Sequence, residues 1–386
     1  MKENITNNIR IAIIGIGSMG KKYATLIHSS KIKGLQLCAV CCRSDSNKQW
    51  VRENLNDSVS IYESTELLFE HSNEFDAVLI VTPHKEHPDL VIKAFEHGLH
   101  VFCDKPAGIS ASDAKRMNAA AKKSSKAYAM MFHKRTMPIY QAIKHKLEAK
   151  ELGALLRVSF VNTESLRTKA YHESSPWRST WAKEGGGLLI NQAQHPLDLW
   201  QWWFGLPKSL YADICFGKLN TFHVDDESTL LMQYDSGMRG SFIVSTIEGA
   251  GYERIEISGT QGKIIAQGNT LTQYEYLESL DTFISNGENG ASFSFTSRED
   301  MYEKNPSPYV TMLQNFADHI LHNIPLIAPG EDGLPSIELT NAAYLSAWCD
   351  EKISLPLNDG MYLEELKKTI QKEQEIDKTS KNNDHL

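Results

Sequence analysis

The sequence predicts a protein of two domains: an α/β domain built on a parallel sheet, followed by an α+β domain with a large, mainly antiparallel sheet. Short β-branched runs alternate with helical patterns in the first third of the chain, which is typical of parallel strands with crossover helices. Alternating apolar and polar segments, separated by glycine turns, follow after residue 155 and are typical of antiparallel strands. A chain of 386 residues with ordinary globular composition is long enough for two such cores.

We therefore expect a first domain over residues 1–131 and a second over residues 132–362. Within the second domain, residues 309–323 have the apolar spacing of a helix. The last segment, residues 363–386, is charged and poor in apolar side chains. We expect it to form a frayed helix or a disordered tail.

A glycine-rich turn follows the first predicted strand. Residues 9–14 are an almost unbroken β-branched run, as in a strand buried on both faces, and residues 21–30 have a helical pattern. The sequence GIGSMG between them has the glycine spacing of a Rossmann dinucleotide-binding domain. In that fold the first glycine makes the turn, the second admits the pyrophosphate, and the third lets the helix pack on the strand. The cofactor-binding candidates in this turn are Gly15, Gly17, Ser18, Met19 and Gly20.

The tip of the second predicted strand, residues 35–42, bears on the choice between NAD and NADP. A carboxylate normally binds the ribose hydroxyls of NAD at this point, but here Arg43 and Ser44 follow the strand. A guanidinium accommodates a 2′-phosphate more naturally than a bare diol, so we expect an NAD(P) cofactor with NADP favoured. The alternative is that Arg43 is merely exposed and that Asp45 binds the ribose.

A lysine lies at the carboxyl end of a later parallel strand. Residues 77–81 and 100–103 are buried-strand patterns, and the second runs directly into Asp104, Lys105 and Pro106. Doubly wound sheets bind ligands outside the carboxyl ends of their strands, so Lys105 is a catalytic candidate. The alternative is an ordinary surface lysine, which the neighbouring proline disfavours because it fixes the turn.

A second candidate group lies in residues 185–198, GGGLLINQAQHPLD. If this stretch is helical, Asn191, His195 and Asp198 share one face because of their spacing. The imidazole of His195 titrates near physiological pH and could act as a general acid or base. Three glycines would let the backbone approach a ligand closely. The alternative is a helix with a capping glycine loop and a histidine of purely structural role.

Aromatic and cationic side chains precede this stretch in a long excursion between predicted strands, residues 165–184. Long insertions of this kind are often functional. Trp177, Arg178 and Trp181 have the chemistry of a sugar site, because aromatic faces suit C–H groups and guanidinium donors suit hydroxyls or a carboxylate. The alternative for each tryptophan is core packing. Tyr171 and His172 are the next candidates for the base if His195 is not it.

The stretches GIGSMG, TPHKEHPDLVIKAFEHGLHVFCDKP and GGGLLINQAQHPLD together resemble the glucose–fructose oxidoreductase/inositol dehydrogenase (Gfo/Idh/MocA) family. The likeness extends to about residue 362, and it implies that residues 325–348, a loop and a second helix, return toward the first domain. It matches Lys105 to the lysine of the family's E-K-P and His195 to the histidine of its G-G-G-x-x-x-D-x-x-x-H-x-x-D. Arg135 resembles the family's substrate-side arginine.

Two sets of candidate site residues follow from these motifs. Beyond the glycine turn, the cofactor-binding candidates are Arg43, Ser44, Thr82, Pro83, His87, Asp104 and Lys105. The substrate-binding candidates are Lys105, Arg135, Trp177, Arg178, Trp181, Asn191 and His195.

Three positions depart from the family pattern. Asp104 replaces the usual glutamate, which keeps the charge on a shorter side chain. Asn191 replaces the usual aspartate, so it can hydrogen-bond a hydroxyl but cannot accept a proton as a carboxylate would. Pro196 follows the histidine and would kink a helix unless it lies in the first turn, so it bears on where His195 points.

The expected activity is hydride transfer between NAD(P) and a secondary carbinol of a sugar, polyol or glycoside. Lys105 would stabilise the developing alkoxide, His195 would take or return the hydroxyl proton, and Asn191 would orient the hydroxyl. One alternative is a redox-neutral glycosidase or epimerase that recycles a tightly bound NAD(H). Another is a nucleotide- or sugar-sensing binding protein without catalysis. The presence of both Lys105 and His195 argues against this second alternative.

Composition narrows the partners. The net charge of -8 argues against a nucleic-acid surface, and no apolar stretch is long enough to cross a membrane. The polar N-terminal residues do not resemble a signal peptide, so we expect a cytoplasmic protein. No pair of residues follows the His84 and His87 pair to complete a zinc site, so we expect no metal. We also expect a homo-oligomer, a dimer or a tetramer.

Overall fold

The computed structural model describes residues 8–219 and 222–383, and the chain divides into two compact units. The first unit comprises Met1–Thr136 and Pro306–Ile337, and the second comprises Met137–Asn305 and Glu338–Leu386. The first division lies close to the predicted boundary after residue 131. Residues 306–337 were predicted as part of the second domain, in a C-terminal region whose helices return to the first domain, and they belong to the first unit. The reason is visible in the packing of Phe316 against Phe102, whose ring centroids are 5.1 Å apart.

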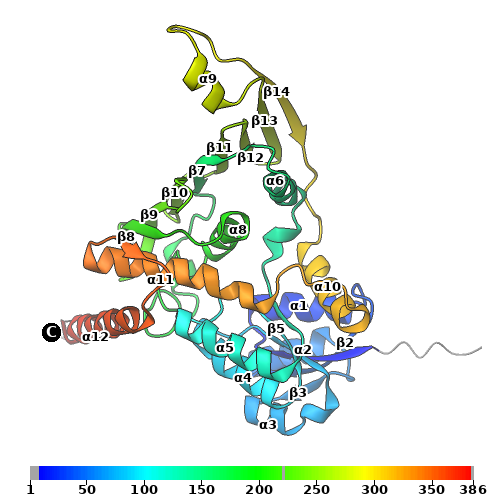
Figure 1. Ribbon diagram of the computed structural model, residues 1–386. Helices are drawn as coiled ribbons and strands as arrows, with labels where there is room; N and C mark the ends of the chain where they lie inside the picture. The colour runs from blue at the N-terminus through cyan, green and yellow to red at the C-terminus, as the bar shows by residue number, and fades with distance from the viewer. Residues whose placement is uncertain (1–7, 220–221, 384–386) are drawn as a thin grey trace, which may run out of the picture. The chain divides into compact units, whose positions relative to one another are not determined.

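The first unit contains a six-stranded parallel sheet in the order β3-β2-β1-β4-β5-β6, of which β2, β3 and β5 are labelled in Figure 1. Its strands are β1 (Ile9–Ile14), β2 (Leu35–Cys41), β3 (Ser60–Tyr62), β4 (Ala77–Ile80), β5 (His100–Cys103) and β6 (Tyr128–Met130). The strand order reverses between β1 and β4, which is the switch point where doubly wound sheets bind nucleotides. All of β4 is buried, as its continuous apolar run predicts.

Helices of the first unit connect these strands or come from the returning segment. They are α1 (Ser18–His28), α2 (Asp45–Asn54), α3 (Thr65–Glu70), α4 (His87–Glu96), α5 (Ala111–Ser124) and α10 (Pro308–His322), with short 3₁₀ turns at Ser72–Glu74, His84–Glu86, His133–Thr136 and Gly330–Asp332. Serine side chains cap α2, α3 and α5; for example, the Ser110 hydroxyl accepts from the Asp113 N–H at 3.1 Å. Helix α1 begins instead at Gly17, without a side-chain cap.

The second unit is built on a nine-stranded sheet in the order β14-β13-β12-β11-β7-β10-β9-β8-β15. The strands are β7 (Leu155–Asn162), β8 (Ser209–Phe216), β9 (Asp225–Gln233), β10 (Arg239–Ser245), β11 (Glu253–Gly259), β12 (Gly262–Gln267), β13 (Thr270–Tyr276), β14 (Phe295–Met301) and β15 (Ile353–Ser354). Pairing is antiparallel except between β7 and β10, which confirms the predicted mainly antiparallel sheet. Burial alternates residue by residue along β11, so the sheet has one packed and one more open face.

Helix α8 covers part of the packed face of this sheet. The helices of the second unit are α6 (Pro138–Glu148), α7 (Lys169–His172), α8 (Gln194–Phe204), α9 (Leu280–Asn286) and α12 (Asp359–Asn383), and α11 (Gly333–Cys349) contains the division between the units. Trp200 of α8 has no exposed surface and packs edge-on against Phe242 of β10, with centroids 5.8 Å apart. The strand makes room for it at Gly240, where a Cβ atom would lie 2.5 Å from the indole.

Helix α12 accounts for most of the segment predicted as a charged tail. Of the two alternatives for that segment, the structure has the helix, which runs to Asn383. Tyr362, Leu366 and Glu373 form a buried stripe on it, and the Glu373 carboxylate accepts from the Trp181 N–H at 2.9 Å. Neither α12 nor any other helix within residues 8–219 and 222–383 is long and apolar enough to span a membrane.

Candidate functional site

The glycine turn after β1 has the geometry that a pyrophosphate-binding loop needs. Gly15 has a φ of +101°, and a Cβ atom there would lie 2.6 Å from the Val81 carbonyl oxygen. A Cβ atom on Gly20 would collide with the Gly15 carbonyl, so the third glycine brings helix and strand together. Nothing lies within 4 Å of the corresponding point on Gly17, which leaves the start of α1 open. The chain therefore fits a bound dinucleotide at this turn.

The tip of β2 presents both side chains weighed for the adenosine ribose. The Arg43 side chain is 81% exposed, and its nearest carboxylate is that of Glu86 at 3.8 Å. Ser44 caps α2 by accepting from the Asn47 N–H at 3.3 Å. The Asp45 side chain is fully exposed, 3.3 Å from Lys48 Nζ. Both Arg43 and Asp45 are thus open to a ligand.

His87 joins the loop after β4 to the turn after β5. Its ring has no exposed surface, and Nδ1 and Nε2 lie 2.8 Å from the carbonyl oxygens of Pro106 and Thr82 respectively. Burial, assisted by the charge of Lys105, lowers the pKa of His87 and favours the neutral ring, which donates to one of the two carbonyls. The structure therefore places His87 behind these loops, holding Thr82 and the Lys105-Pro106 turn in place.

The turn that carries Lys105 is organised by the carboxylate before it. Asp104 Oδ1 accepts from the Lys105 backbone N–H at 2.9 Å, and the Tyr23 hydroxyl donates to Oδ2 at 3.4 Å. Burial raises the pKa of Asp104 to about 6, against the opposing effect of the Lys105 charge. Tyr23 is fully buried on α1 and packs on Tyr309 of α10, with ring centroids 5.7 Å apart. No local signal in the sequence identified either tyrosine, because Tyr23 bonds to Asp104 and packs on Tyr309 from segments that are distant in the chain.

Arg135 lies inside the first unit. Its side chain is 1% exposed, and Nη1 lies 2.5 Å from the Asp332 carboxylate and 3.2 Å from the Ile327 carbonyl oxygen. The guanidinium also lies 5.5 Å from the Phe132 ring centroid. These contacts fasten the returning segment to the end of β6, so Arg135 has a structural role in addition to the substrate role predicted for it.

The structure brings Asn191 together with a buried carboxylate that the motif reading missed. Asn191 Nδ2 donates to Glu184 Oε1 at 2.7 Å, and Glu184 is only 2% exposed. The other Glu184 oxygen accepts from the Ser179 N–H, and Arg178 Nη1 lies 3.9 Å from Oε1. Glu184 thus holds a negative charge directly beside the asparagine that replaces the family's acid.

Three donors converge on the hydroxyl of Tyr171. Arg178 Nη1 donates to it at 2.8 Å, Gln192 Nε2 at 2.9 Å and Asn191 Nδ2 at 3.4 Å. The Arg178 guanidinium also lies 4.6 Å from the Trp177 ring centroid. Of the predicted substrate residues, the structure therefore assembles Trp177, Arg178 and Asn191 around Tyr171.

Trp181 belongs to the core. It is 1% exposed and packs against Tyr344 and Trp348, with ring centroids 4.9 Å and 5.2 Å away. Its indole N–H donates to the His223 carbonyl at 2.7 Å. These contacts match the packing alternative for this tryptophan.

The glycine run before Asn191 serves close packing. A Cβ atom on Gly186, which has a φ of +137°, would collide with the Tyr344 hydroxyl, and one on Gly187 would collide with the Asp225 backbone. The Asp225 carboxylate accepts from the N–H groups of Gly187 and Leu189, both at 2.7 Å. Burial raises the pKa of Asp225, and these bonds oppose that rise. The neighbouring atoms therefore indicate that these glycines allow close packing within the protein, and not the close approach of a ligand that the sequence predicted.

His195 lies in the first turn of α8. The helix begins at Gln194, so Asn191 lies in the preceding turn, and the predicted helical stripe through Asn191 is wrong. Pro196 falls within the first turn, where a proline does not disrupt helical hydrogen bonds. Asp198 is fully buried and accepts from Gln201 Nε2 at 3.0 Å, whereas His195 is half-buried.

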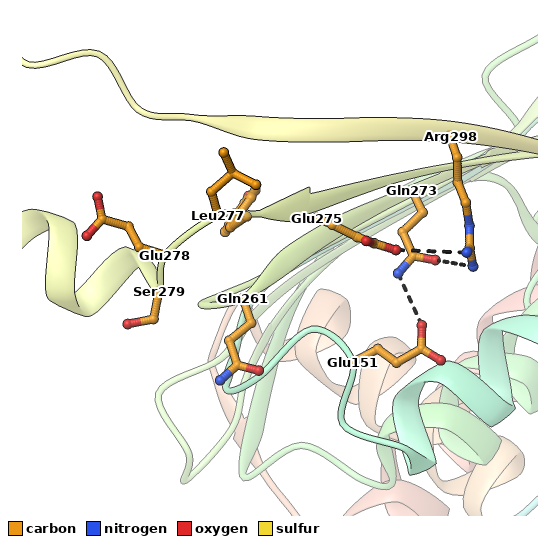
Figure 2. Close-up of a pocket in the computed structure, with 9 residues that line it drawn as sticks. Glu151, Gln261, Gln273, Glu275, Leu277, Glu278, Ser279 and Arg298 are labelled. Carbon is orange, nitrogen blue, oxygen red and sulfur yellow. Dashed lines mark hydrogen bonds and ion pairs between the residues drawn. The ribbon is translucent and has the colours of Figure 1, made fainter.

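A separate surface pocket of about 600 Å³ lies at the β12–β14 end of the second sheet (Figure 2). Its lining residues are Glu151, Gln261, Gln273, Glu275, Tyr276, Leu277, Glu278, Ser279 and Arg298. The polar groups bond to one another: Gln273 Nε2 donates to Glu151 at 3.1 Å, and Arg298 donates to Gln273 Oε1 at 3.2 Å. None of the predicted site residues lines this pocket.

Comparison with known proteins defines the class. Residues 9–132 match the oxidoreductase family with an NAD-binding Rossmann fold, and residues 140–265 match the GFO/IDH/MocA C-terminal domain. The fold and the glycine turn are therefore those of an NAD-binding oxidoreductase. The chain belongs to the Gfo/Idh/MocA family, and several of the family members similar to it are named dehydrogenases.

Relatives at low identity cover most of the chain. Myo-inositol 2-dehydrogenase of Thermotoga maritima is 24% identical over 91% of this chain and 99% of its own. The NAD⁺-dependent scyllo-inositol 2-dehydrogenase of Bacillus subtilis is 24% identical over 87% of this chain and 93% of its own. Among solved structures, WlbA dehydrogenase of Chromobacterium violaceum, in complex with NADH and UDP-GlcNAcA, matches with a TM-score of 0.77 and 25% identity, covering 91% of this chain and 97% of that one.

Proposed function

We propose that this protein is an NAD(P)-dependent dehydrogenase acting on a secondary carbinol of a sugar, polyol or glycoside. The observation that carries the proposal is the network of Tyr171, Arg178, Asn191 and Gln192, which gathers hydroxyl-binding groups immediately before His195. Named relatives that act on inositols, and a WlbA neighbour that binds a nucleotide sugar, support the same substrate class.

In this proposal the chain's own residues bind, orient and move a proton. The glycine turn and the start of α1 would hold the pyrophosphate of the dinucleotide, which when bound would supply the hydride chemistry. The Lys105 ammonium donates to the carbinol oxygen and stabilises the developing alkoxide. The His195 imidazole accepts the hydroxyl proton, and the Asn191 network orients the reacting ring.

The proposal extends to cofactor choice, with NADP(H) preferred over NAD(H). The exposure of Arg43 at the tip of β2 supports this preference. Within the described residues, the guanidinium pairs only with the Glu86 carboxylate, at 3.8 Å. A guanidinium forms paired hydrogen bonds with phosphate oxygens. Exposed Asp45 would favour NAD instead, so direct titration decides between them.

The test of the activity is a substrate panel followed at the nicotinamide absorbance with NAD and NADP supplied separately. The panel contains myo-inositol, a free hexose, a methyl hexoside and a simple secondary alcohol. Polyol or sugar oxidation well above that of the simple alcohol is expected. Product formed from a glycoside without net cofactor reduction would instead establish the redox-neutral alternative.

We also propose that the protein is a homo-oligomer that assembles through the arm formed by β14 and α9. Strand β14 ends the sheet order, and no residue of α9 is buried within the described chain (Figure 1). Ile284 and Met301 on this arm are 72% and 80% exposed, and Leu277, shortly before α9, is 69% exposed. An edge strand leaves backbone N–H and C=O groups open to a further strand, and the exposed apolar side chains beside β14 favour contact with a second copy of the chain.

A further inference from the structure

Two arginines gather at one phenol ring in the excursion between β7 and α8. The guanidinium carbons of Arg167 and Arg178 lie 4.7 Å and 4.5 Å from the ring centroid of Tyr171. Each guanidinium is attracted to the ring. Two like charges brought to the same ring repel one another, and this repulsion is relieved when an anion binds between or beside them.

The surrounding carboxylates compensate only part of this charge. Arg178 has the buried Glu184 carboxylate at 3.9 Å. Arg167 forms no ion pair in the described part of the chain, and its Nη1 donates to the Leu166 carbonyl oxygen at 3.3 Å. The nearby Lys169 and Glu173 pair with each other at 3.6 Å. Within residues 8–219 and 222–383, the charge of Arg167 is therefore not balanced by a carboxylate in an ion pair.

Each arginine also has one N–H donor, at Nε, that a ligand could use. The Nε atoms of Arg167 and Arg178 are buried, and neither has a hydrogen-bond partner in residues 8–219 and 222–383. A buried N–H without a partner is costly. A ligand with two acceptor oxygens would supply partners after a modest rotation of the side chains, because carboxylates and phosphates accept two parallel bonds from a guanidinium.

The backbone and the neighbouring ring hold this pair in place. The Arg167 N–H donates to the Thr246 carbonyl oxygen at 2.8 Å, which fixes the excursion to the end of β10. Arg178 is held by the Tyr171 hydroxyl at 2.8 Å and lies 4.6 Å from the Trp177 ring centroid. Because these side chains are already held in place, little conformational entropy is lost when they bind an acidic sugar.

We infer that Arg167 and Arg178, held at Tyr171, bind an anionic oxygen group of the substrate, so that the preferred substrate is an acidic sugar derivative. The group is a carboxylate or a phosphate ester. This inference deepens the proposed function and depends on it for the reaction, but the binding of the anion rests on these contacts alone.

Three matched probes test the inference by binding rather than by turnover: D-glucose, D-glucuronate and D-glucose 6-phosphate. Isothermal titration is performed at low salt in the presence of saturating NADH. At least one anionic probe should bind more tightly than glucose by roughly 10- to 100-fold, and salt should reduce the difference. Which of the two binds tighter identifies the carboxylate or the phosphate as the group recognised. Anionic probes that bind no more tightly than glucose, including no binding of any probe, would overturn the inference.

Two variants distinguish direct binding by the Arg167 guanidinium from a long-range effect of positive charge in the same segment. Arg167→Gln should remove most of the preference for the anionic probe, measured as the ratio of the Kd values of glucose and of the anionic probe for the same variant. Lys169→Gln removes the same charge from the same segment, from a side chain 72% exposed, and should keep the preference. An equal effect of both variants would show that only long-range charge matters and would refute the assignment. If the anion preference persists but no substrate is oxidised, the proposed function fails and the anion site stands.

Discussion

Asn191→Asp would place a second carboxylate beside one that is already buried. The Asn191 amide nitrogen donates to Glu184 at 2.7 Å, and Glu184 is 2% exposed. The substitution changes no volume, so packing is preserved. It replaces a donor with an acceptor and so converts a hydrogen bond into a repulsion.

The size of the effect follows from two competing costs. Two carboxylates 2.7 Å apart repel by about 6 kcal/mol at an effective dielectric constant of ~20. Keeping one of them protonated at pH 7 costs about 3.7 kcal/mol if its ordinary pKa is about 4.3. Proton uptake is the cheaper outcome, so it sets the penalty. We expect Asn191→Asp to lower the free energy of unfolding by about 3–4 kcal/mol at pH 7.

The same reasoning fixes the pH dependence. The pKa of the shared carboxyl is raised in the folded variant relative to the unfolded chain. The deficit is therefore absent below the unfolded pKa and grows as pH rises, by about 1.4 kcal/mol per pH unit. Urea unfolding of variant and parent should differ by about 1 kcal/mol at about pH 5 and by about 5 kcal/mol at about pH 8.

Two further variants make the result specific to this pair. Adding Glu184→Gln to Asn191→Asp exchanges the amide and the acid, and it should recover most of the lost stability. Gln192→Glu adds the same charge at the next residue, which is half-buried and bonded to Tyr171, and should cost less. A deficit that is equal at both pH values, or an exchange variant that recovers less than half, would refute the reasoning.

Other predictions concern cofactor choice, proton transfer and assembly. Arg43→Ala should weaken NADP(H) binding by roughly 10-fold with little effect on NAD(H), whereas equal losses in titrations of both cofactors would contradict the preference. Lys105→Ala and His195→Ala should each lower kcat by roughly 10²–10⁴-fold while the cofactor still binds; a variant with near-normal turnover across pH would exclude its residue from the reaction. Ile284→Asp should reduce the oligomer to smaller species in light scattering, and an unchanged mass would place the interface away from the β14 arm.

Local patterns were sufficient for the first unit. The bounds of β1 and β5 are those expected from their apolar runs, and the three glycines of the turn after β1 have the steric roles expected from their spacing. In such a unit each strand, turn and helix is specified by neighbouring residues. The return of the C-terminal helices to the first domain was implied by the family resemblance and not by local patterns, because it depends on Phe316 packing against Phe102 from far along the chain.

The role of the glycines at residues 185–187 could not be predicted from the local sequence. A series of glycines before a histidine is equally consistent with a ligand-binding turn and with close packing. What decides between them is the identity of the neighbours, Tyr344 and Asp225, which are remote in sequence. Trp181 poses the same problem, since its role is set by Tyr344 and Trp348.

The sequence shows that Asn191 replaces the family's aspartate, but it does not show that another carboxylate lies beside this position. An asparagine in place of the family's aspartate suggested that a negative charge had been lost. The turn through the glycines instead brings Glu184 to within 2.7 Å of the amide, so one carboxylate remains in the network at a different position. Its charge balances Arg178, while the amide lets Asn191 bond to Glu184 and to Tyr171 together. Had both positions been acids, one of them would have taken up a proton at pH 7 at a cost of about 3–4 kcal/mol in stability, and Arg178 would still have faced a single negative charge.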